Sequence, residues 1–232
     1  MERKANHDLR EQPAYGVTEA AHYLRLPPAT LSSWTLGRDY ETADGTRRWK
    51  PLIQAADSRH RRLSFVNLVE AHVLAAIRRD HRIRIPSVRN ALNYVSQKLG
   101  RARPLWDVIF ETDGASLFVE KYGALINASR QGQLTMRELL AAHLRRIERD
   151  SHRIPIRLYP ARSGGDEPSC FVAIDPRIAF GRPALIGAGV PVAVLADRFR
   201  GGDSVTLLAD DYGVDRDAVE EALRQADLLR AA

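Results

Sequence analysis

The order of apolar and polar positions near the N-terminus predicts two short helices joined by a tight turn. Thr18 carries a hydroxyl that can accept from first-turn N–H groups, so it is expected to open the first helix. Leu26-Pro27-Pro28 must interrupt that helix, because proline lacks an N–H group. Pro28 suits the first turn of a second helix running to Trp34.

The buried side of the second helix is expected to be formed by Leu31 and Trp34, packed against a long helix that opens at Ser64. Between these helices, Asp44-Gly45 is a strong signal for a β-hairpin. The long helix has apolar positions at spacings of three and four, which predict one buried face formed by Phe65, Leu68, Val69, His72, Val73, Ala76 and Ile77.

The middle of the chain changes pattern several times. Pro86 is expected to start a helix that Gly100 ends. Residues 107–127 resemble a hairpin that turns at Asp113-Gly114. A further helix is expected from Gln133 or Thr135 to Ile147, with the outer face carrying Arg145, Arg146 and Arg149. A strand is expected over 154–159.

The last third begins with short strands near 171–174 and 183–186 and then turns helical. Helices are expected over 192–200, from Ser204 to Gly213, and from Asp215 onward. The Gly- and Ser-containing stretch 163–169 is the best linker candidate. We therefore predict an α+β, mainly helical chain with three parts: residues 1–84, a mixed helix and hairpin section 85–165, and a C-terminal helical module 166–232.

Charge separates the ends of this 232-residue chain. Residues 1–165 contain 28 basic and 17 acidic residues, a net charge of +11, whereas residues 166–232 contain 7 and 12, a net charge of −5. A basic surface favours a polyanionic partner such as nucleic acid. The two ends are therefore expected to bind different partners.

The second helix and the hairpin after it contain the candidate DNA-binding residues. Small hydroxyl side chains on the outward face of the helix, those of Thr30, Ser32 and Ser33, can reach phosphates or base edges. Phosphate contacts are expected from Arg38, Arg47, Arg48, Lys50, Arg61 and Arg62. The alternative is a small helical domain with a solvated basic face; the coincidence of helix pattern and charge favours DNA binding.

The segment Tyr15-Gly16-Val17-Thr18-Glu19-Ala20-Ala21, with Thr30-Leu31-Ser32-Ser33-Trp34, resembles the opening of the MerR-type winged helix-turn-helix regulators. The likeness continues through Arg62-Leu63-Ser64-Phe65-Val66-Asn67-Leu68. It implies that the second helix enters the major groove and that a wing contacts the DNA backbone. The stretch between Trp34 and Arg62 is longer than usual in that family, and no effector-binding cysteines follow.

Residues 172–226 resemble a small uncharacterised homeodomain-like family. The resemblance rests on Ile174-Asp175-Pro176-Arg177-Ile178, Gly181-Arg182-Pro183 and Val219-Glu220-Glu221-Ala222-Leu223. Members are commonly encoded beside a PIN-like ribonuclease toxin and are regarded as VapB-type antitoxins. The family usually has Thr-Arg after its second glycine, where this chain has Ala188-Gly189.

The C-terminal helices are expected to contact protein rather than DNA. Their carboxylates, including those of Asp210, Asp211 and Asp215, would be repelled by phosphates. A PIN-like partner would present clustered carboxylates, which an arginine can bind bidentately. Candidates are Arg224 or Arg230, with apolar anchorage from Leu223, Leu228 and Leu229; alternatively, these leucines complete the module's own core or a dimer seam.

Other chemistry has little support in the sequence. Cys170 is the only cysteine, and the histidines lack metal-ligand spacing, so no disulfide, metal or cofactor is expected. Without an apolar segment of spanning length, the chain is expected in the cytoplasm.

The predicted function is that of an antitoxin in a type II toxin-antitoxin system. The chain would be a homodimer that neutralises a PIN-like ribonuclease toxin and autoregulates its operon by binding double-stranded operator DNA. The alternative is a stand-alone MerR-like regulator that senses a ligand through its middle section. A hydrolase ranks a distant third, because no catalytic constellation supports an enzyme.

Overall fold

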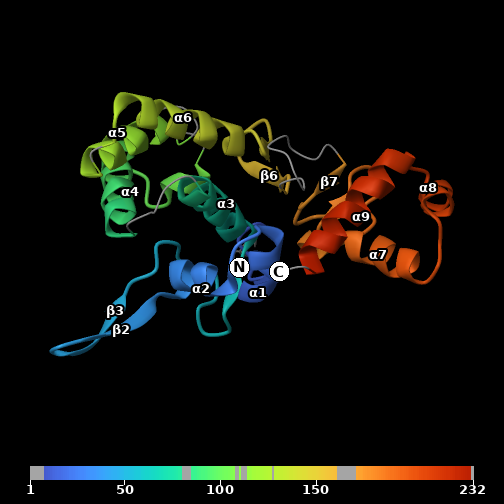
Figure 1. Cartoon of the computed structure of the whole chain (residues 1–232), viewed down its shortest axis with the longest axis horizontal. Helices are drawn as coiled ribbons and strands as arrows, with labels where there is room; N and C mark the ends of the chain where they lie inside the picture. Colours follow the sequence, from blue (N-terminus) through green and yellow to red (C-terminus); the bar gives the residue numbers. More distant parts are fainter. Residues whose placement is uncertain are drawn as a thin grey trace, which may run out of the picture. The chain divides into compact units, whose positions relative to one another are not determined.

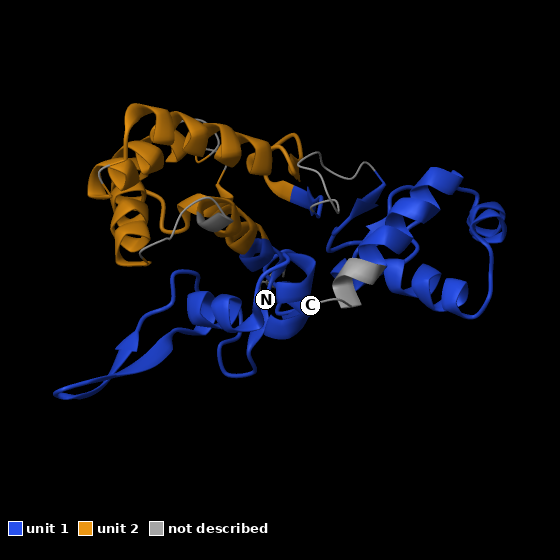
Figure 2. Ribbon diagram, in the orientation of Figure 1, with its two compact units in different colours: residues 1–68, 156–232 blue, residues 69–155 orange. Residues whose placement is uncertain are grey.

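A computed structural model describes residues 8–79, 85–107, 110, 114–126, 128–160 and 171–230 (Figure 1). The chain divides into two compact units, one formed by residues 1–68 and 156–232 and the other by residues 69–155 (Figure 2). The described part is an α+β structure in which helices predominate over short two-stranded sheets, as predicted. The expected linker 163–169 lies outside the described residues.

The first unit begins with a helix pair, α1 (Val17–Tyr23) and α2 (Pro28–Leu36). Pro28 is the first residue of α2, as predicted. The expectation that Thr18 opens α1 is wrong, because Gly16 occupies the N-cap and the helix already includes Val17. The carboxylate of Glu19 accepts from the Gly16 N–H at 3.3 Å. At the start of the helix, the N-cap N–H group is therefore hydrogen-bonded to a carboxylate rather than to a hydroxyl.

The predicted hairpin follows α2 directly. Strand β2 (Arg38–Thr42) pairs antiparallel with β3 (Gly45–Trp49), and the register places Thr42 opposite Gly45. Gly45 has a φ of +112°, a conformation that other residues rarely adopt. In Figure 1 the hairpin extends away from α2 as a two-stranded ribbon.

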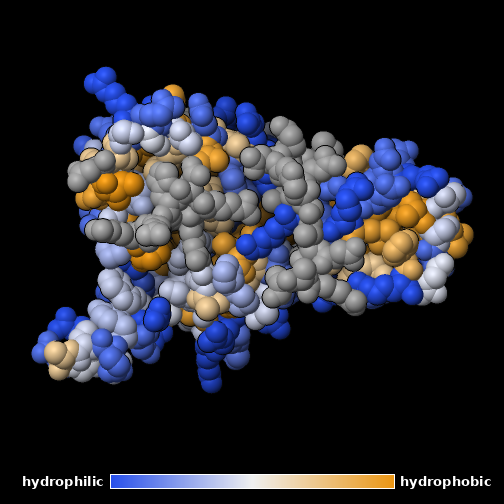
Figure 3. Space-filling view, viewed as in Figure 1, coloured by the Kyte–Doolittle hydropathy of each residue, from blue (hydrophilic) through white to orange (hydrophobic). Residues whose placement is uncertain are grey.

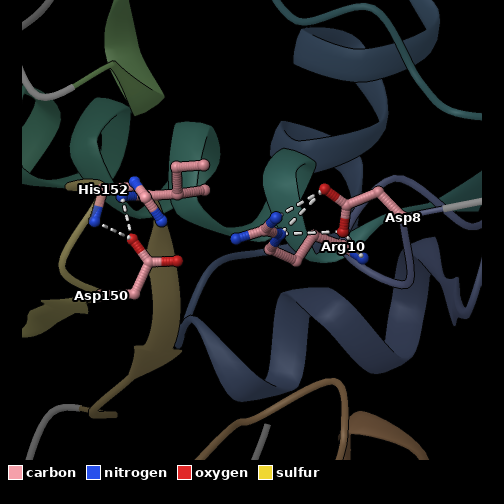
Figure 4. Close-up of polar contacts among 5 residues, drawn as sticks. Asp8, Arg10, Asp150 and His152 are labelled. Atoms are coloured by element: carbon pink, nitrogen blue, oxygen red, sulfur yellow. Dashed lines mark hydrogen bonds and ion pairs between the residues drawn. The ribbon is translucent and has the colours of Figure 1, made fainter. Parts of the chain in front are cut away.

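The long helix α3 (Phe65–Arg79) starts where the sequence predicts. Ser64 Oγ accepts from the Asn67 N–H at 3.2 Å, and Asn67 Oδ1 accepts from the Ser64 N–H at 3.1 Å, so the two residues form a reciprocal cap. The Arg10 carbonyl accepts from the Val66 N–H at 3.0 Å. Arg10 is itself held by Asp8 through bonds of 2.7 and 2.8 Å (Figure 4). The predicted apolar face of α3 is buried, but so are the other residues from 65 to 77, including Asn67 and Glu70, so the expectation of a single buried face is wrong.

A small sheet connects this region: β1 (Tyr15–Gly16) pairs antiparallel with β4 (Arg62–Leu63), the strand that leads into α3.

The second unit contains α4 (Ile85–Leu99), a 3-10 turn η1 (Pro104–Trp106), α5 (Ala115–Leu125) and α6 (Arg130–Leu144). Helix α5 packs against both α4 and α6. Gly100, in a left-handed conformation, follows the last residue of α4 as predicted.

The hairpin expected over 107–127 is wrong, because residues 115–125 are helical. Phe118 and Tyr122, one helical turn apart, are buried and stack with ring centroids 5.5 Å apart. Their spacing therefore belongs to a helix that packs on two neighbours. Residues 108, 109 and 111–113 lie outside the described part of the chain.

Helix α6 also differs from expectation at both ends. Its N-cap is Ser129, whose Oγ accepts from the Gly132 N–H at 3.1 Å, and it ends at Leu144, so Ile147 belongs to a strand. Arg146 was expected on an outer face, but only 1% of its surface is exposed. That expectation extended the helical periodicity to Arg146, but α6 ends at Leu144, so the periodicity does not apply there.

Strand β5 (Ile147–Arg149) pairs with β6 (Pro155–Leu158), where a strand was predicted. Asp150 Oδ1 stabilises the turn between them by accepting from the His152 and Ile154 N–H groups at 2.9 Å (Figure 4).

The C-terminal part of the first unit matches the predicted element order. Strands β7 (Val172–Ala173) and β8 (Ala184–Leu185) form an antiparallel pair, followed by α7 (Val192–Arg200), α8 (Val205–Tyr212) and α9 (Arg216–Arg230). Ser204 Oγ accepts from the Leu207 N–H at 3.1 Å, and Gly213, with a φ of +62°, ends α8. One apolar cluster joins the three helices to the strands, with Leu195, Leu208 and Val219 fully buried.

The loop between β7 and β8 has an unusual backbone. Ala179, Phe180 and Gly181 all have positive φ angles, in the 3-10 turn η3 (Ala179–Gly181). Asp175, only 2% exposed, anchors the loop by accepting from Arg157 at 3.0 Å and from Arg177 at 2.8 Å. Phe180 in this loop is 92% exposed. No helix in the described ranges is long and apolar enough to cross a membrane.

Candidate nucleic-acid interface

Helix α2 presents the three predicted hydroxyl residues beside a fully buried face. Leu31 is 0% and Trp34 is 4% exposed, so the prediction that these side chains are buried is confirmed. Thr30, Ser32 and Ser33 are half-buried on the same helix. The helix therefore has a fixed inner side and a hydroxyl-bearing side that is partly open to solvent.

The loop before β4 brings one predicted cation to this helix. Asp57 and Arg62 exchange backbone hydrogen bonds of 2.8 and 3.0 Å, which closes the loop. Arg61 has a φ of +55°, and its guanidinium donates to Ser32 Oγ at 3.2 Å. Hydrogen bonds from the His60 N–H and the His60 ring hold the pKa of Asp57 below its usual range. Arg61 and Ser32, which were predicted separately as DNA-binding residues, are therefore linked by a hydrogen bond.

The base of the hairpin is attached to the end of α2. Arg48 donates to the Leu36 carbonyl at 2.8 Å and to the Asp39 carboxylate at 3.1 Å. Gly37 has φ +81° and ψ −177°, and a Cβ there would collide with the Trp49 carbonyl. This backbone region is accessible almost only to glycine. The hairpin is therefore fixed to the helix by backbone geometry and by one arginine.

The antiparallel register gives the hairpin two chemically different faces. Directly opposed residues share a face. One face contains the pairs Arg38 with Trp49 and Tyr40 with Arg47; the other contains Asp39 with Arg48 and Glu41 with Thr46. On the first face, Tyr40 and Trp49 stack with centroids 5.1 Å apart. The sequence prediction missed these two aromatic residues, although strict alternation from the Asp44-Gly45 turn would have placed them beside Arg38 and Arg47.

The predicted phosphate-binding cations are all exposed, although several also have protein partners. Arg47 pairs with Asp44 at 3.2 Å, and Arg62 donates to the Ala14 carbonyl at 3.3 Å. Arg38 pairs with Trp49 at the open end of the ladder, and Lys50 follows Trp49 at that same end. In Figure 3 the surface over the hairpin is mostly hydrophilic. The exposed guanidinium groups of this site can bind an anion without breaking a buried contact.

Comparison with known proteins gives a consistent picture. Residues 13–92 match a family described as "Putative DNA-binding HTH domain", and residues 172–226 match "Protein of unknown function (DUF433)". The chain is 31% identical over 229 residues to "Putative antitoxin VapB45" of Mycobacterium tuberculosis, and the match covers 91% of this chain and 92% of that protein. The chain belongs to the VapB45 family.

A crystal structure of Rv2018 from Mycobacterium tuberculosis has a related fold. Its TM-score is 0.67 at 25% identity, and the match covers 91% of this chain and 98% of the other. In this member of the VapB45 family, the region matching the DNA-binding family includes α1, α2, the hairpin and α3. The region matching the uncharacterised family includes α7 and α8 and most of α9.

The residues predicted to bind a protein partner lie on α9. Leu223 packs against the apolar cluster of the C-terminal helices, as the alternative interpretation of that leucine holds. Arg224 pairs with Glu221 at 3.2 Å and with Glu220 at 3.6 Å. The side chains of Leu228, Leu229 and Arg230 lie outside the described part of the structure.

Proposed function

We propose that this member of the VapB45 family is an antitoxin that binds operator DNA through α2 and the hairpin β2–β3. The observation that carries the proposal is the exposed set of arginines on a hairpin fixed to a hydroxyl-bearing helix, in a region that matches a DNA-binding family. In this proposal the region is a winged helix-turn-helix of the MerR type, α2 enters the major groove and the hairpin is the wing.

The three-part division predicted from the sequence assigns a role to each of the two end parts of the chain. Residues 1–84 bind the operator, residues 166–232 form a homeodomain-like module that holds a PIN-like ribonuclease toxin, and residues 85–165 lie between them. The toxin's clustered carboxylates would be complementary to an arginine at the end of α9. Arg230, with Leu228 and Leu229, is the proposed contact, and Arg224 is the second choice because Glu220 and Glu221 already engage it.

Autoregulation follows from joining the two activities in one chain. Binding of a cytoplasmic homodimer to its own operator would repress the operon, and a two-fold protein matches a palindromic site. A stand-alone regulator without a toxin would share the DNA-binding half but not the second activity.

The DNA half of the proposal is tested with the DNA upstream of the chain's own gene. We expect the full-length protein to bind this duplex more tightly than a scrambled duplex in fluorescence anisotropy. The triple variant Thr30→Ala/Ser32→Ala/Ser33→Ala should reduce that preference while leaving the salt dependence unchanged, because base contacts specify and phosphate contacts position. Equal affinity of the parent for both duplexes would contradict operator recognition.

The toxin half is tested by co-expression with an adjacent PIN-like reading frame. We expect the full-length chain to relieve growth arrest and to co-purify with the toxin. Arg224→Gln/Arg230→Gln should weaken both effects while operator affinity stays the same. Operator binding without any relief of growth arrest by the parent would instead support the stand-alone regulator.

A further inference from the structure

The hairpin β2–β3 has one face that is suited to duplex DNA and one that is not. We infer that Arg38 and Arg47, together with the Tyr40–Trp49 stack, form the surface that holds the sugar-phosphate backbone, whereas Arg48 is a strut that fixes the hairpin to α2. This inference rests on the proposed DNA binding and divides the hairpin arginines into two roles. The four residues Arg38, Tyr40, Arg47 and Trp49 are called the cation face below.

The cation face combines two charges with an aromatic surface. Among its ladder residues, Arg38, Tyr40, Thr42, Gly45, Arg47 and Trp49, there is no carboxylate, so the side-chain charge is +2. The two arginines lie on one diagonal of the ladder and the two aromatic rings on the other. Diagonal neighbours in a sheet are about 7–8 Å apart, a spacing that two flexible guanidinium arms can extend to successive phosphates.

The opposite face is internally paired. The Asp39 carboxylate accepts from Arg48 at 3.1 Å, and Glu41 accepts from the Thr46 hydroxyl at 2.9 Å. Two carboxylates and one guanidinium give this face a charge of −1. A phosphate approaching it would meet two like charges. Electrostatics therefore orients the hairpin with the cation face toward DNA.

Arg48 and Arg47 differ in what they would lose on binding a phosphate. Arg48 would have to release the Leu36 carbonyl at the end of α2 as well as Asp39. Arg47 has one ion pair, with Asp44, whose side chains are 60% and 80% exposed; the Arg48–Asp39 pair is similarly exposed at 62% and 57%, so the bond to the Leu36 carbonyl is what distinguishes Arg48. Exposed ion pairs contribute about 0–1 kcal/mol, so a phosphate can replace Asp44 at little cost.

The aromatic pair stiffens the cation face and adds apolar contact. Trp49 is 39% exposed although it stacks on Tyr40, so part of the indole remains open to solvent. An open aromatic surface between two phosphate-binding arginines can pack against deoxyribose. The pair therefore contributes affinity that does not depend on salt.

The experiment measures how the affinity of the full-length protein for a 30-base-pair duplex of arbitrary sequence depends on salt. Each phosphate contact contributes about 0.9 to the slope of log affinity against log salt concentration. Arg38→Gln/Arg47→Gln should lower the slope by about 1.8 and weaken binding to all sequences alike. Thermal melts should confirm that this exposed double variant remains folded.

The matched control is Asp39→Asn/Arg48→Gln, which removes the pair on the opposite face without changing the net charge. Its slope should equal that of the parent even if loss of the Arg48 bond to the Leu36 carbonyl lowers the affinity. A loss of about one unit of slope in this control would make Arg48 a phosphate contact and overturn the division. An unchanged slope in Arg38→Gln/Arg47→Gln would overturn the cation face itself.

A third variant tests the aromatic pair. Trp49→Leu should weaken binding severalfold at every salt concentration and leave the slope unchanged; unchanged affinity would exclude the aromatic residues from the contact. Failure of the parent protein to bind any duplex would reject the proposed function. If the parent binds but Arg38→Gln/Arg47→Gln leaves the salt slope unchanged, only the assignment of the cation face is rejected.

Discussion

The two ends of the first unit both contain two helices joined by a short turn, yet their surfaces differ in charge. The pair α1 and α2 is followed by a hairpin whose cation face has a charge of +2. The pair α8 and α9 is joined through Gly213 and exposes the carboxylates of Asp210, Asp215 and Asp217. Both helix pairs contain buried apolar side chains. The two helix pairs thus share an apolar pattern but differ in the sign of their surface charge, which in our proposal suits the first pair to DNA and the second to a protein.

The largest expected effect comes from removing the buried indole of the N-terminal helix pair. Trp34→Ala should lower the free energy of unfolding by about 3–5 kcal/mol, because the side chain is 4% exposed and its removal leaves a cavity. DNA binding should be lost with it. As the control for stability alone, Trp49→Ala should change the free energy of unfolding by less than about 1 kcal/mol, since that indole is 39% exposed. Equal melting temperatures for Trp34→Ala and the parent would contradict the burial of α2.

Two glycines that follow helices, Gly37 after α2 and Gly213 after α8, extend the comparison between the two helix pairs. Gly37→Ala should cost about 2–4 kcal/mol, because the backbone conformation is accessible almost only to glycine and the new Cβ would meet the Trp49 carbonyl. Gly213→Ala should cost about 1 kcal/mol, since its left-handed conformation has open space around it. Chemical denaturation measures both values. A smaller loss for Gly37→Ala than for Gly213→Ala would mean that the hairpin is not fixed to α2 as described.

The buried carboxylate of the C-terminal region gives a pH-dependent effect. Burial raises the pKa of Asp175, but hydrogen bonds from Arg177 and Arg157 outweigh it and hold the pKa below its usual range. A lowered folded-state pKa contributes stability above the unfolded value of about 4, and this contribution is lost as pH falls through the folded value. Asp175→Asn should therefore cost about 2–3 kcal/mol at pH 7.

The matched measurement is a series of denaturation curves for the parent and Asp175→Asn between pH 7 and pH 3. The difference in unfolding free energy should be constant near neutrality and should shrink below about pH 4. A difference that persists unchanged at pH 3 would show that Asp175 acts through packing rather than through its charge.

The elements predicted well from the sequence are those defined by local chemistry. Ser204 and Gly213 bound α8 where the sequence placed them, because a serine cap and a left-handed glycine act within a few residues. The segment 115–125 was predicted wrongly because a turn signal at Asp113-Gly114 is also local, whereas the helix depends on packing against α4 and α6. In the candidate site, the arginines were predictable from charge. Their division between two faces required the register, which pairs Asp39 with Arg48.

The smallest expected effect comes from neutralising exposed carboxylates of α8 and α9. This change tests whether these helices contact DNA. Asp210→Asn/Asp215→Asn/Asp217→Asn removes three exposed negative charges and keeps side chains of nearly the same size. If only the N-terminal helix pair and the hairpin contact the duplex, the slope of log affinity against log salt concentration should match that of the parent, because no phosphate contact is gained. Anisotropy titrations at several salt concentrations measure this directly. A slope steeper by about one unit would show that the C-terminal helices lie against the phosphates, and the separation of the two surfaces by charge would then be wrong.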